Sequence, residues 1–172
     1  MSTQTHTTFQ IHGISSGVLD TARSTRLDAL SNPVVHLVAS GGEPLRCCLR
    51  DAVEGEELML FGYEPVLPAG PYREIGPVFA HLRDCPGSLD IDTYPPAWRG
   101  RPQALRAYDD RGWIYDAKVH DGQQPEAIID DLLADPNVVQ IHSRNIAYGC
   151  YMFAITRVGQ DKHKENNDGH EI

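Results

Sequence analysis

VVQIHSRNIAYGCYMFAITRV, residues 138–158, is the stretch around which the rest of this chain is arranged. It reads as two apolar strands joined by a tight loop, which is the pattern of a hairpin in an antiparallel sheet. Gly149 lies directly before Cys150, and a glycine there permits both a sharp turn and the close approach of a ligand to the backbone. The loop end of this hairpin collects the polar candidates His142, Arg144, Asn145 and Cys150.

Short strands also dominate the chain before this stretch. Alternating and apolar runs predict strands at 9–14, 34–40, 45–49, 58–63, 78–82, 104–108 and 113–120. Ser15 and Ser16 are suited to cap a helix that runs to about residue 30. The apolar spacing of 127–134 predicts a second helix, with Pro125 in its first turn.

These elements predict an α+β fold. About eight short strands form a mostly antiparallel sheet that is curled or closed into a half-barrel, and two helices accompany it. We find no internal repeat and no dividing linker, so residues 9–158 are predicted to form a single globular domain. Residues 1–8 and 159–172 are polar and are expected to be flexible.

The net charge of −9 restricts the partners of this protein. A general nucleic-acid binder and a protein that docks on anionic membranes both need positive charge, so neither partner is expected. A small anionic molecule is compatible with the sequence, because a local group of arginines can oppose the overall sign. No apolar run approaches the ~18 residues of a membrane span, and no signal peptide is visible, so we expect a cytoplasmic protein. The sequence does not indicate an oligomeric state.

Cysteine and histidine spacing predicts neither a metal site nor a cofactor. The four cysteines contain no C-x-x-C pair, and reduced thiols in a cytosolic protein are the expected state. The eight histidines are scattered without H-x-H or H-E-x-x-H spacing, which argues against a structural zinc. Motifs for phosphate loops, dinucleotides and serine hydrolases are also missing from the sequence.

Strand alternation predicts one polar face on the sheet. If 45–50, 104–108, 113–120 and 138–144 are regular strands, alternate residues share a side. That side collects Arg46, Arg50, Arg106, Asp116, His142 and Arg144. One interpretation is a solvated outer face with weak surface pairs. The other is a concave floor where guanidinium groups bind a carboxylate or phosphate.

The segment 62–79 is rich in proline and glycine and forbids regular structure over most of its length. Long connections of this kind are often functional. In the concave interpretation this loop acts as a lid and offers Tyr72 and Arg73 to the ligand. In the plainer interpretation Tyr72 is a packing residue.

Cys150 and His142 are the candidate catalytic pair. A thiol and an imidazole at facing ends of a hairpin are able to form a nucleophile and its base. Asp116 is a candidate to orient the histidine or an arginine. The alternative for Cys150 is a buried, inert thiol, and the alternative for Asp116 is an exposed carboxylate.

Three parts of the chain carry a family resemblance. They are PLRCCLRDAVEGEELMLFGYE (44–64), GPYREIGPVF (70–79), and LRAYDDRGWIYDAKVHDG with DPNVVQIHSRNIAYGCY (105–122 and 135–151). In order and spacing they resemble the bacterial family catalogued as domain of unknown function 1203, from about residue 9 to 158. The matching positions are Arg46, Arg50, Asp51, Pro71, Tyr72, Arg73, Gly76, Pro77, Arg106, Asp116, Asn145, Gly149 and Cys150.

The chain departs from the family pattern at two positions. Leu45 stands where the family has a cysteine, and Arg144 stands where it has a histidine. A site with two histidines is therefore not expected here, because His142 is the only histidine in its strand. The resemblance implies a small soluble bacterial protein and supplies no activity.

Two functions remain as hypotheses from the sequence. The first is a cytosolic enzyme, for instance a biosynthetic one, acting on a small anionic molecule. Arg46, Arg106 and Arg73 would hold the anion, with Arg50, Tyr72, Arg144 and Asn145 as further binding residues. His142 would act as acid or base, and Cys150 as nucleophile or pocket wall. The second is a non-catalytic module that binds a metabolite or a protein. A purely structural protein has no support from the polar turns.

Overall fold

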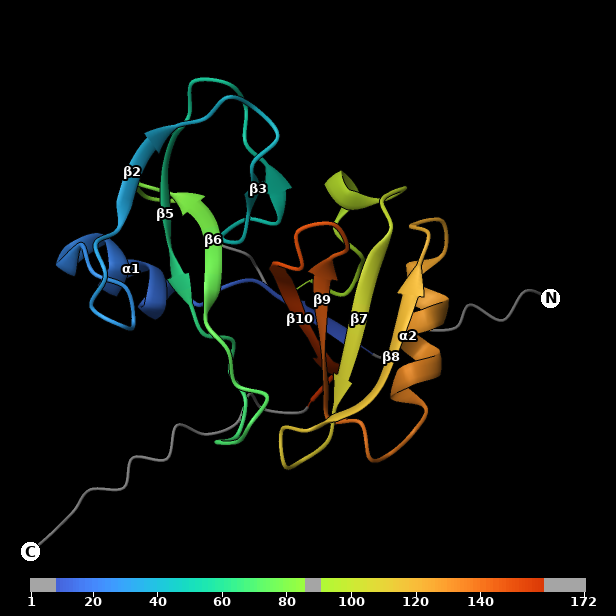
Figure 1. The fold of residues 1–172 in the computed structure, drawn as a ribbon. Helices are drawn as coiled ribbons and strands as arrows, with labels where there is room; N and C mark the ends of the chain where they lie inside the picture. Colours follow the sequence, from blue (N-terminus) through green and yellow to red (C-terminus); the bar gives the residue numbers. More distant parts are fainter. Residues whose placement is uncertain (1–8, 86–90, 160–172) are drawn as a thin grey trace, which may run out of the picture.

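The computed structural model describes residues 9–85 and 91–159, which contain two α-helices and ten strands in two sheets. Figure 1 shows the two sheets side by side, with one helix beside each. The predicted flexible termini lie outside the described residues, except for Gly159. The α+β class is confirmed. The prediction of about eight strands in one half-barrel is wrong, because the strands divide equally between two sheets.

The first sheet contains the stretch 138–158 and has the order β1-β10-β9-β7-β8, with every neighbouring pair antiparallel. Its strands are β1 (Phe9–His12), β7 (Gln103–Tyr108), β8 (Ile114–His120), β9 (Gln140–Asn145) and β10 (Tyr151–Arg157). The predicted hairpins at 104–120 and 138–158 are both confirmed, as β7–β8 and β9–β10.

The second sheet has the order β2-β5-β6-β3-β4. Its strands are β2 (Val35–Val38), β3 (Pro44–Leu45), β4 (Arg50–Asp51), β5 (Glu57–Tyr63) and β6 (Gly76–His81). β3 pairs with β6 in parallel, and the other pairs are antiparallel. β5 therefore lies between β2 and β6.

Helix α2 (Pro125–Leu133) covers one face of the first sheet. Its apolar side buries Ile129, Leu132 and Leu133, because residues three and four apart share one face of a helix. They pack against Leu105 and Ile141 of the sheet in one continuous core. An ion pair between Lys118 of β8 and Asp131 of α2 closes the edge of this layer.

Helix α1 (Ser16–Thr25) packs on the second sheet through Leu19 and Ala22. The Ser15 hydroxyl accepts a hydrogen bond from the Val18 N–H and caps the helix, as predicted. The helix ends about five residues before the predicted limit at residue 30, because Arg26 adopts a left-handed conformation with φ of 59°. No helix in the described ranges is long and apolar enough to cross a membrane.

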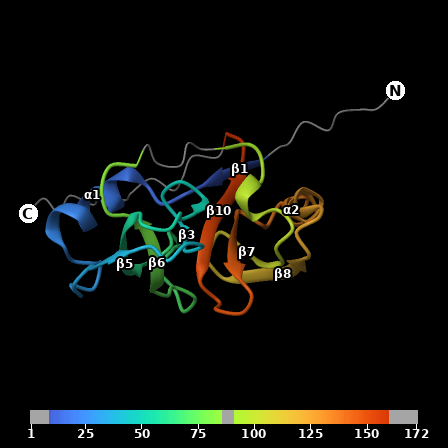
Figure 2. The same cartoon turned by 90° about the horizontal axis from the view of Figure 1, so that it is seen from above.

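Aromatic side chains join the two sheets. Phe153 of β10 stacks on Trp98 at 5.9 Å between ring centroids, and the Trp98 Nε1–H donates to Asp51 of β4 at 2.9 Å. Trp98 belongs to the short 3₁₀ helix η1 (Pro96–Trp98). Tyr151, at the start of β10, packs into the core of the second sheet. Seen from above in Figure 2, β10 runs between the two halves of the molecule.

The predicted strand at 45–49 is a turn. β3 ends at Leu45, residues 46–49 turn, and Leu49 has a φ of 57° before β4 begins at Arg50. In a strand, neighbouring side chains face opposite sides, whereas a turn allows neighbours to point to one place. The turn therefore gives Arg46, Cys47 and Cys48 other positions than a strand would. These positions determine which residues come together in the two sites described below.

Candidate functional site

Two predicted site residues lie directly opposite each other on the first sheet. Arg106 of β7 is the Cα partner of His142 on β9, and such partners share a face. Arg144, two residues further along β9, lies on that face as well. Asp116 is the partner of Ala107 and therefore lies on the opposite face, where it is exposed. The prediction that Asp116 joins Arg106 and His142 is wrong, because the β7–β8 register places Ala117 opposite Arg106.

The loop between β5 and β6 approaches this arginine face, as the lid prediction required, but it brings its own carboxylate. Glu74 Oε1 lies 2.9 Å from Arg106 Nη1 and also pairs with Arg144. The Gln140 side-chain amide donates to the Val66 carbonyl at 3.2 Å, which joins the loop to β9. The two arginines expected to hold a ligand anion are therefore paired with an anion of the protein.

The two lid residues named from the sequence have other partners. Tyr72 packs edge-on against Trp113, with 6.4 Å between ring centroids. Arg73 forms an ion pair with Glu64. The structure therefore does not bring Tyr72 and Arg73 together with Arg46 and Arg106 as a single anion-binding set.

His142 is completely buried. Its Nε2 lies 3.3 Å from Gln140 Oε1, and its ring lies 4.7 Å from the Tyr108 ring. Burial, together with Arg144 and Arg106, lowers its pKa to about 3, so the imidazole is neutral near pH 7. A neutral, buried imidazole is a poor candidate for exchanging protons with a solvent-facing substrate.

The expected pair of Cys150 and His142 does not form. The Cα partner of His142 on β10 is Ala154, four residues beyond Cys150. Because a β-bulge lies between Tyr151 and Phe153, Cys150 is level with Asn145, three residues from His142 along β9. At about 3.3 Å per residue, this offset is roughly 10 Å along the strand. The catalytic pairing predicted from the hairpin is therefore wrong, because the register places Arg144, and not His142, at the loop end opposite Tyr151.

The arginine face is the least satisfied part of the described core. Tyr108 Oη, His142 Nδ1 and Arg144 Nε are buried and have no hydrogen-bond partner among the residues of the two described ranges. Buried polar atoms are nearly always hydrogen-bonded in native proteins. The arginine face therefore contains three buried polar atoms whose loss of water is not offset by a hydrogen bond within the described residues.

A separate cavity of about 460 Å³ opens between the two sheets. We call it the interface groove. It is lined by Gly41, Gly42, Glu43, Pro44, Arg46, Leu60, Pro77, Phe79, Asn145, Tyr148 and Cys150. Three predicted site residues, Arg46, Asn145 and Cys150, meet in this groove.

Arg46 is the buried cation of the interface groove. Its side chain enters from the turn after β3, and the residue is 2% exposed. Its Nε donates to the Tyr151 carbonyl at 2.8 Å, and its Nη1 donates to the Pro44 carbonyl. Burial lowers its pKa to about 10, which leaves it charged at pH 7. No carboxylate of residues 9–85 or 91–159 forms an ion pair with it.

The β9–β10 loop forms one wall of the groove. Asn145 Oδ1 accepts the Tyr148 N–H at 3.1 Å and shapes the turn. Cys150 Sγ lies 3.7 Å from the Tyr148 carbonyl oxygen. Across the groove, the Glu43 carboxylate accepts the N–H groups of Ser40 and Gly41 at 2.7 and 3.0 Å, which lowers its pKa. Glu43 is thus a charged neighbour whose oxygens already have backbone partners.

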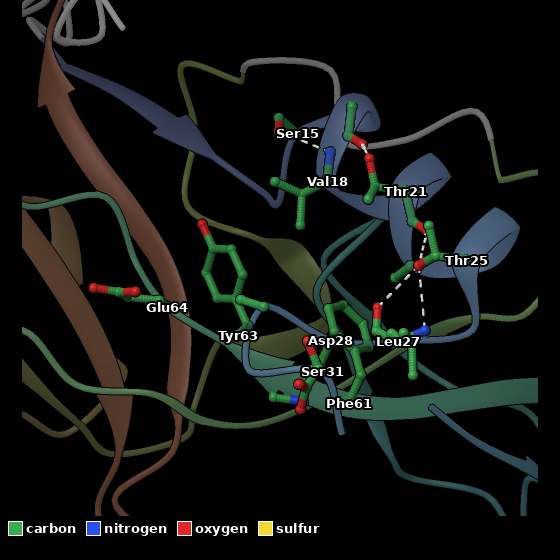
Figure 3. Close-up of a pocket in the computed structure, with 14 residues that line it drawn as sticks. Ser15, Val18, Thr21, Thr25, Leu27, Asp28, Ser31, Phe61, Tyr63 and Glu64 are labelled. Atoms are coloured by element: carbon green, nitrogen blue, oxygen red, sulfur yellow. Dashed lines mark hydrogen bonds between the residues drawn. The ribbon is translucent and has the colours of Figure 1, made fainter. Parts of the chain in front are cut away.

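Another cavity, of about 760 Å³, lies between α1 and β5 (Figure 3). Its polar groups are already used: Thr21 and Thr25 donate to helix carbonyls, and Asp28 accepts the N–H groups of Leu30, Asn32 and Gly62. None of the site residues predicted from the sequence lines it. We therefore place the candidate ligand site in the smaller interface groove.

Sequence patterns did not reveal a cluster of sulfur and histidine ligands in the second sheet. The sulfurs of Cys47, Cys48 and Cys85 and a ring nitrogen of His81 all lie within 4.8 Å of one another. These four residues are the group in the described ranges that could hold a metal ion. We call them the Cys₃His cluster. A hydrogen bond between the Cys47 and Cys48 thiols, together with one from the His81 N–H, lowers the pKa of Cys47 to about 5.

The Arg50 side chain lies beside the Cys₃His cluster and not on the arginine face. Its two terminal nitrogens donate to Glu56 at 3.0 and 2.7 Å, and Nη2 lies 3.3 Å from His81 Nε2. The prediction that Arg50 shares a face with Arg106 and His142 is wrong, because β4 belongs to the other sheet. For the Cys₃His cluster, the signal available in the sequence was the spacing His81-x-x-x-Cys85, which suits two ligands of one metal ion.

Comparison with known proteins gives one match. The family model described as "Protein of unknown function (DUF1203)" matches residues 42–157, which include β3 to β10, the Cys₃His cluster and every residue of the interface groove except Gly41. No curated protein and no solved structure matches the chain. On the extent of this match, which covers more than half of the sequence, the chain belongs to the DUF1203 family of proteins of unknown function.

Proposed function

We propose that this protein binds a small anionic molecule in the interface groove, with Arg46 as the residue that recognises the anion. One observation carries the proposal: Arg46 is buried, charged and without a carboxylate partner in the described residues, and it lines a cavity of about 460 Å³. Buried charges are normally paired, so a carboxylate or phosphate beside Arg46 would supply the missing counter-charge.

The lining of the groove indicates what else the ligand carries. Leu60, Pro77 and Phe79 supply an apolar wall, and Asn145 and the glycines at 41 and 42 supply polar and backbone groups. Ligand sites commonly combine an apolar lining with a few polar anchors. The fitting ligand class is therefore a small organic acid with an apolar part.

The geometry favours binding over nucleophilic catalysis. Cys150 lines the groove, but its expected base, His142, is buried under other residues and is displaced along the strand. An enzymatic version of the proposal needs Cys150 to react without a histidine partner. The non-catalytic alternative needs only Arg46 and the groove lining, and we therefore prefer it.

The test is a screen of small carboxylates and phosphate esters for thermal stabilisation of the full chain. Hits are then titrated by calorimetry against wild type and Arg46→Met. Truncating one partner of a buried charge pair costs about 2–5 kcal/mol, so the dissociation constant should rise at least about 30-fold. Arg83→Met is the matched control, because Arg83 is exposed and pairs with Glu57 on the surface.

A second readout protects the test from misfolding of Arg46→Met. In wild-type protein, a bound ligand should slow alkylation of Cys150, identified by mass spectrometry of its peptide. Equal affinity of wild type and Arg46→Met for every hit, together with unprotected Cys150, would exclude the groove as the binding site.

A further inference from the structure

We propose that Cys47, Cys48, His81 and Cys85 bind one Zn²⁺ ion in a closed, four-ligand site. The ligands come from three places: the turn between β3 and β4, the last residue of β6, and the segment after β6. This site lies apart from the interface groove, which none of the four residues lines. It is therefore independent of the proposed anion binding.

The spacing of the ligand atoms suits tetrahedral zinc. Bonds of about 2.3 Å to sulfur and about 2.0 Å to nitrogen place two sulfurs about 3.8 Å apart and a sulfur and a nitrogen about 3.5 Å apart. The two adjacent sulfurs, of Cys47 and Cys48, are 3.9 Å apart. His81 Nδ1 lies 3.4 Å from the first and 3.9 Å from the second. Three of the four ligand atoms are therefore separated by nearly the distances of tetrahedral zinc, and Cys85 Sγ lies within 4.8 Å of each of them.

The second nitrogen of His81 has the partner expected of a zinc ligand. His81 Nε2 lies 3.2 Å from Glu56 Oε1. A histidine that binds zinc commonly donates its other N–H to a carboxylate, which fixes the tautomer and turns the lone pair toward the metal. Arg50 holds both oxygens of Glu56, so the orienting carboxylate is itself fixed in position.

The charge and hydrogen bonds around the sulfurs also fit a metal thiolate. The His81 backbone N–H donates to Cys47 Sγ at 3.3 Å. Three thiolates, one neutral imidazole and Zn²⁺ carry a net charge of about −1. The Arg50–Glu56 pair beside the histidine is neutral overall, with its guanidinium 3.3 Å from the imidazole.

The ligand types select zinc over other common ions. Thiolates are soft ligands and do not suit Mg²⁺ or Ca²⁺, which prefer oxygen. Four protein ligands fill a tetrahedron and leave no open position, which is the mark of a structural site. A disulfide between Cys47 and Cys48 would be a competing use of these two thiols, but their sulfurs lie 3.9 Å apart, far beyond the roughly 2.05 Å of an S–S bond.

The first experiment measures zinc in untagged, full-length protein purified without chelator. One zinc per chain is expected, and X-ray absorption should show three sulfurs and one nitrogen around it. Cys48→Ser and Cys85→Ser should each lower zinc affinity at least tenfold. Cys150→Ser is the matched control and should keep one zinc, because Cys150 lies in the interface groove. Loss of zinc in Cys150→Ser alone would overturn the assignment.

The second experiment uses only wild-type protein, so it does not depend on the folding of a variant. Without chelator, zinc should protect Cys47, Cys48 and Cys85 from alkylation, and a strong chelator should expose all three at once. Zinc-free protein with these thiols reduced, or with a disulfide between any two of them, would refute the site. Glu56→Gln should weaken zinc binding about 10- to 100-fold if the carboxylate orients His81.

Discussion

Two buried arginines, Arg46 and Arg144, lie on either side of the start of β10. Arg46 donates to the Tyr151 carbonyl at 2.8 Å, and Arg144 donates to the Gly149 carbonyl at 3.2 Å. The two residues are 2% and 7% exposed. They differ in their counter-charge: Arg144 pairs with Glu74, whereas Arg46 pairs with no carboxylate of the described residues.

This difference separates a structural arginine from a candidate binding arginine. The Arg144–Glu74 pair joins β9 to the loop between β5 and β6, so its charge contributes to the fold. Arg46 lies at the wall of a cavity and has no ion pair with a carboxylate of the described residues, although Asp51 attracts its charge from a greater distance. Such a buried charge costs stability unless a ligand pairs with it. Arg46 and Arg144 are alike in residue type and in burial. The feature that distinguishes them is whether a carboxylate forms an ion pair with the guanidinium group.

The largest effect on stability should come from breaking the Arg144 pair. Glu74→Gln leaves Arg144 buried without its counter-charge, and we expect a loss of about 1–2 kcal/mol in the free energy of unfolding, since water partly screens the 46% exposed Glu74 side chain. Urea denaturation of Glu74→Gln, Arg144→Met and the double variant gives the coupling energy between the two residues. Glu64→Gln is the control on the same loop, since its partner Arg73 is 43% exposed, compared with 8% for Arg144, and this pair should contribute less than about 1 kcal/mol.

The measured coupling energy between Glu74 and Arg144 decides whether the protein itself neutralises Arg144 or leaves it open to a ligand. A coupling energy near zero would mean that Glu74 does not neutralise Arg144 in solution, and the arginine face would then rival the interface groove as an anion site. A strong coupling would leave Arg46 as the buried arginine available to a ligand.

The second prediction concerns pH and the histidine beneath Arg144. The folded-state pKa of His142 is about 3, well below the value of 6.5 in the unfolded chain. Between these values the unfolded state binds more protons, so stability is fully present above pH 6.5 and is lost as pH falls. One such group contributes a slope of at most about 1.4 kcal/mol per pH unit.

Unfolding free energies of wild type and His142→Gln between pH 7 and pH 5 test this. The variant should lose stability less steeply than wild type over that range. His36→Gln serves as control, because His36 is exposed beside Glu57. His120 is buried with a lowered pKa and adds a slope common to all three proteins. Parallel curves for wild type and His142→Gln would contradict the buried, neutral state of His142.

Local patterns predicted the elements of the first sheet well and the sites less well. The hairpins at 104–120 and 138–158 and the helix at 127–134 follow from short-range alternation and helical spacing, and all three are confirmed. The division into two sheets depends on long-range pairing, such as β3 with β6, which local periodicity does not encode.

One turn accounts for most of what the sequence did not reveal at the sites. Treating 45–49 as a strand sent Cys47 and Cys48 to opposite faces and put Arg46 and Arg50 on the same face as His142. The left-handed conformation of Leu49, at φ of 57°, closes a turn that no glycine or proline marks. The Cys₃His cluster was therefore hidden, and Arg46 was placed on the face of His142 instead of in the interface groove.

The smallest effect should come from Cys150→Ser. Cys150 is half-buried at the groove and takes no part in the Arg144–Glu74 pair, so we expect the free energy of unfolding to change by less than about 1 kcal/mol. If the groove only binds its ligand, affinity should change by a few fold, because the anchor Arg46 is intact. If Cys150 reacts with the ligand, the serine variant should instead lose a covalent adduct that mass spectrometry detects on wild-type protein. Comparing calorimetry and intact mass for the two proteins, with the same acid at the same concentration, therefore separates a binding groove from a reactive one.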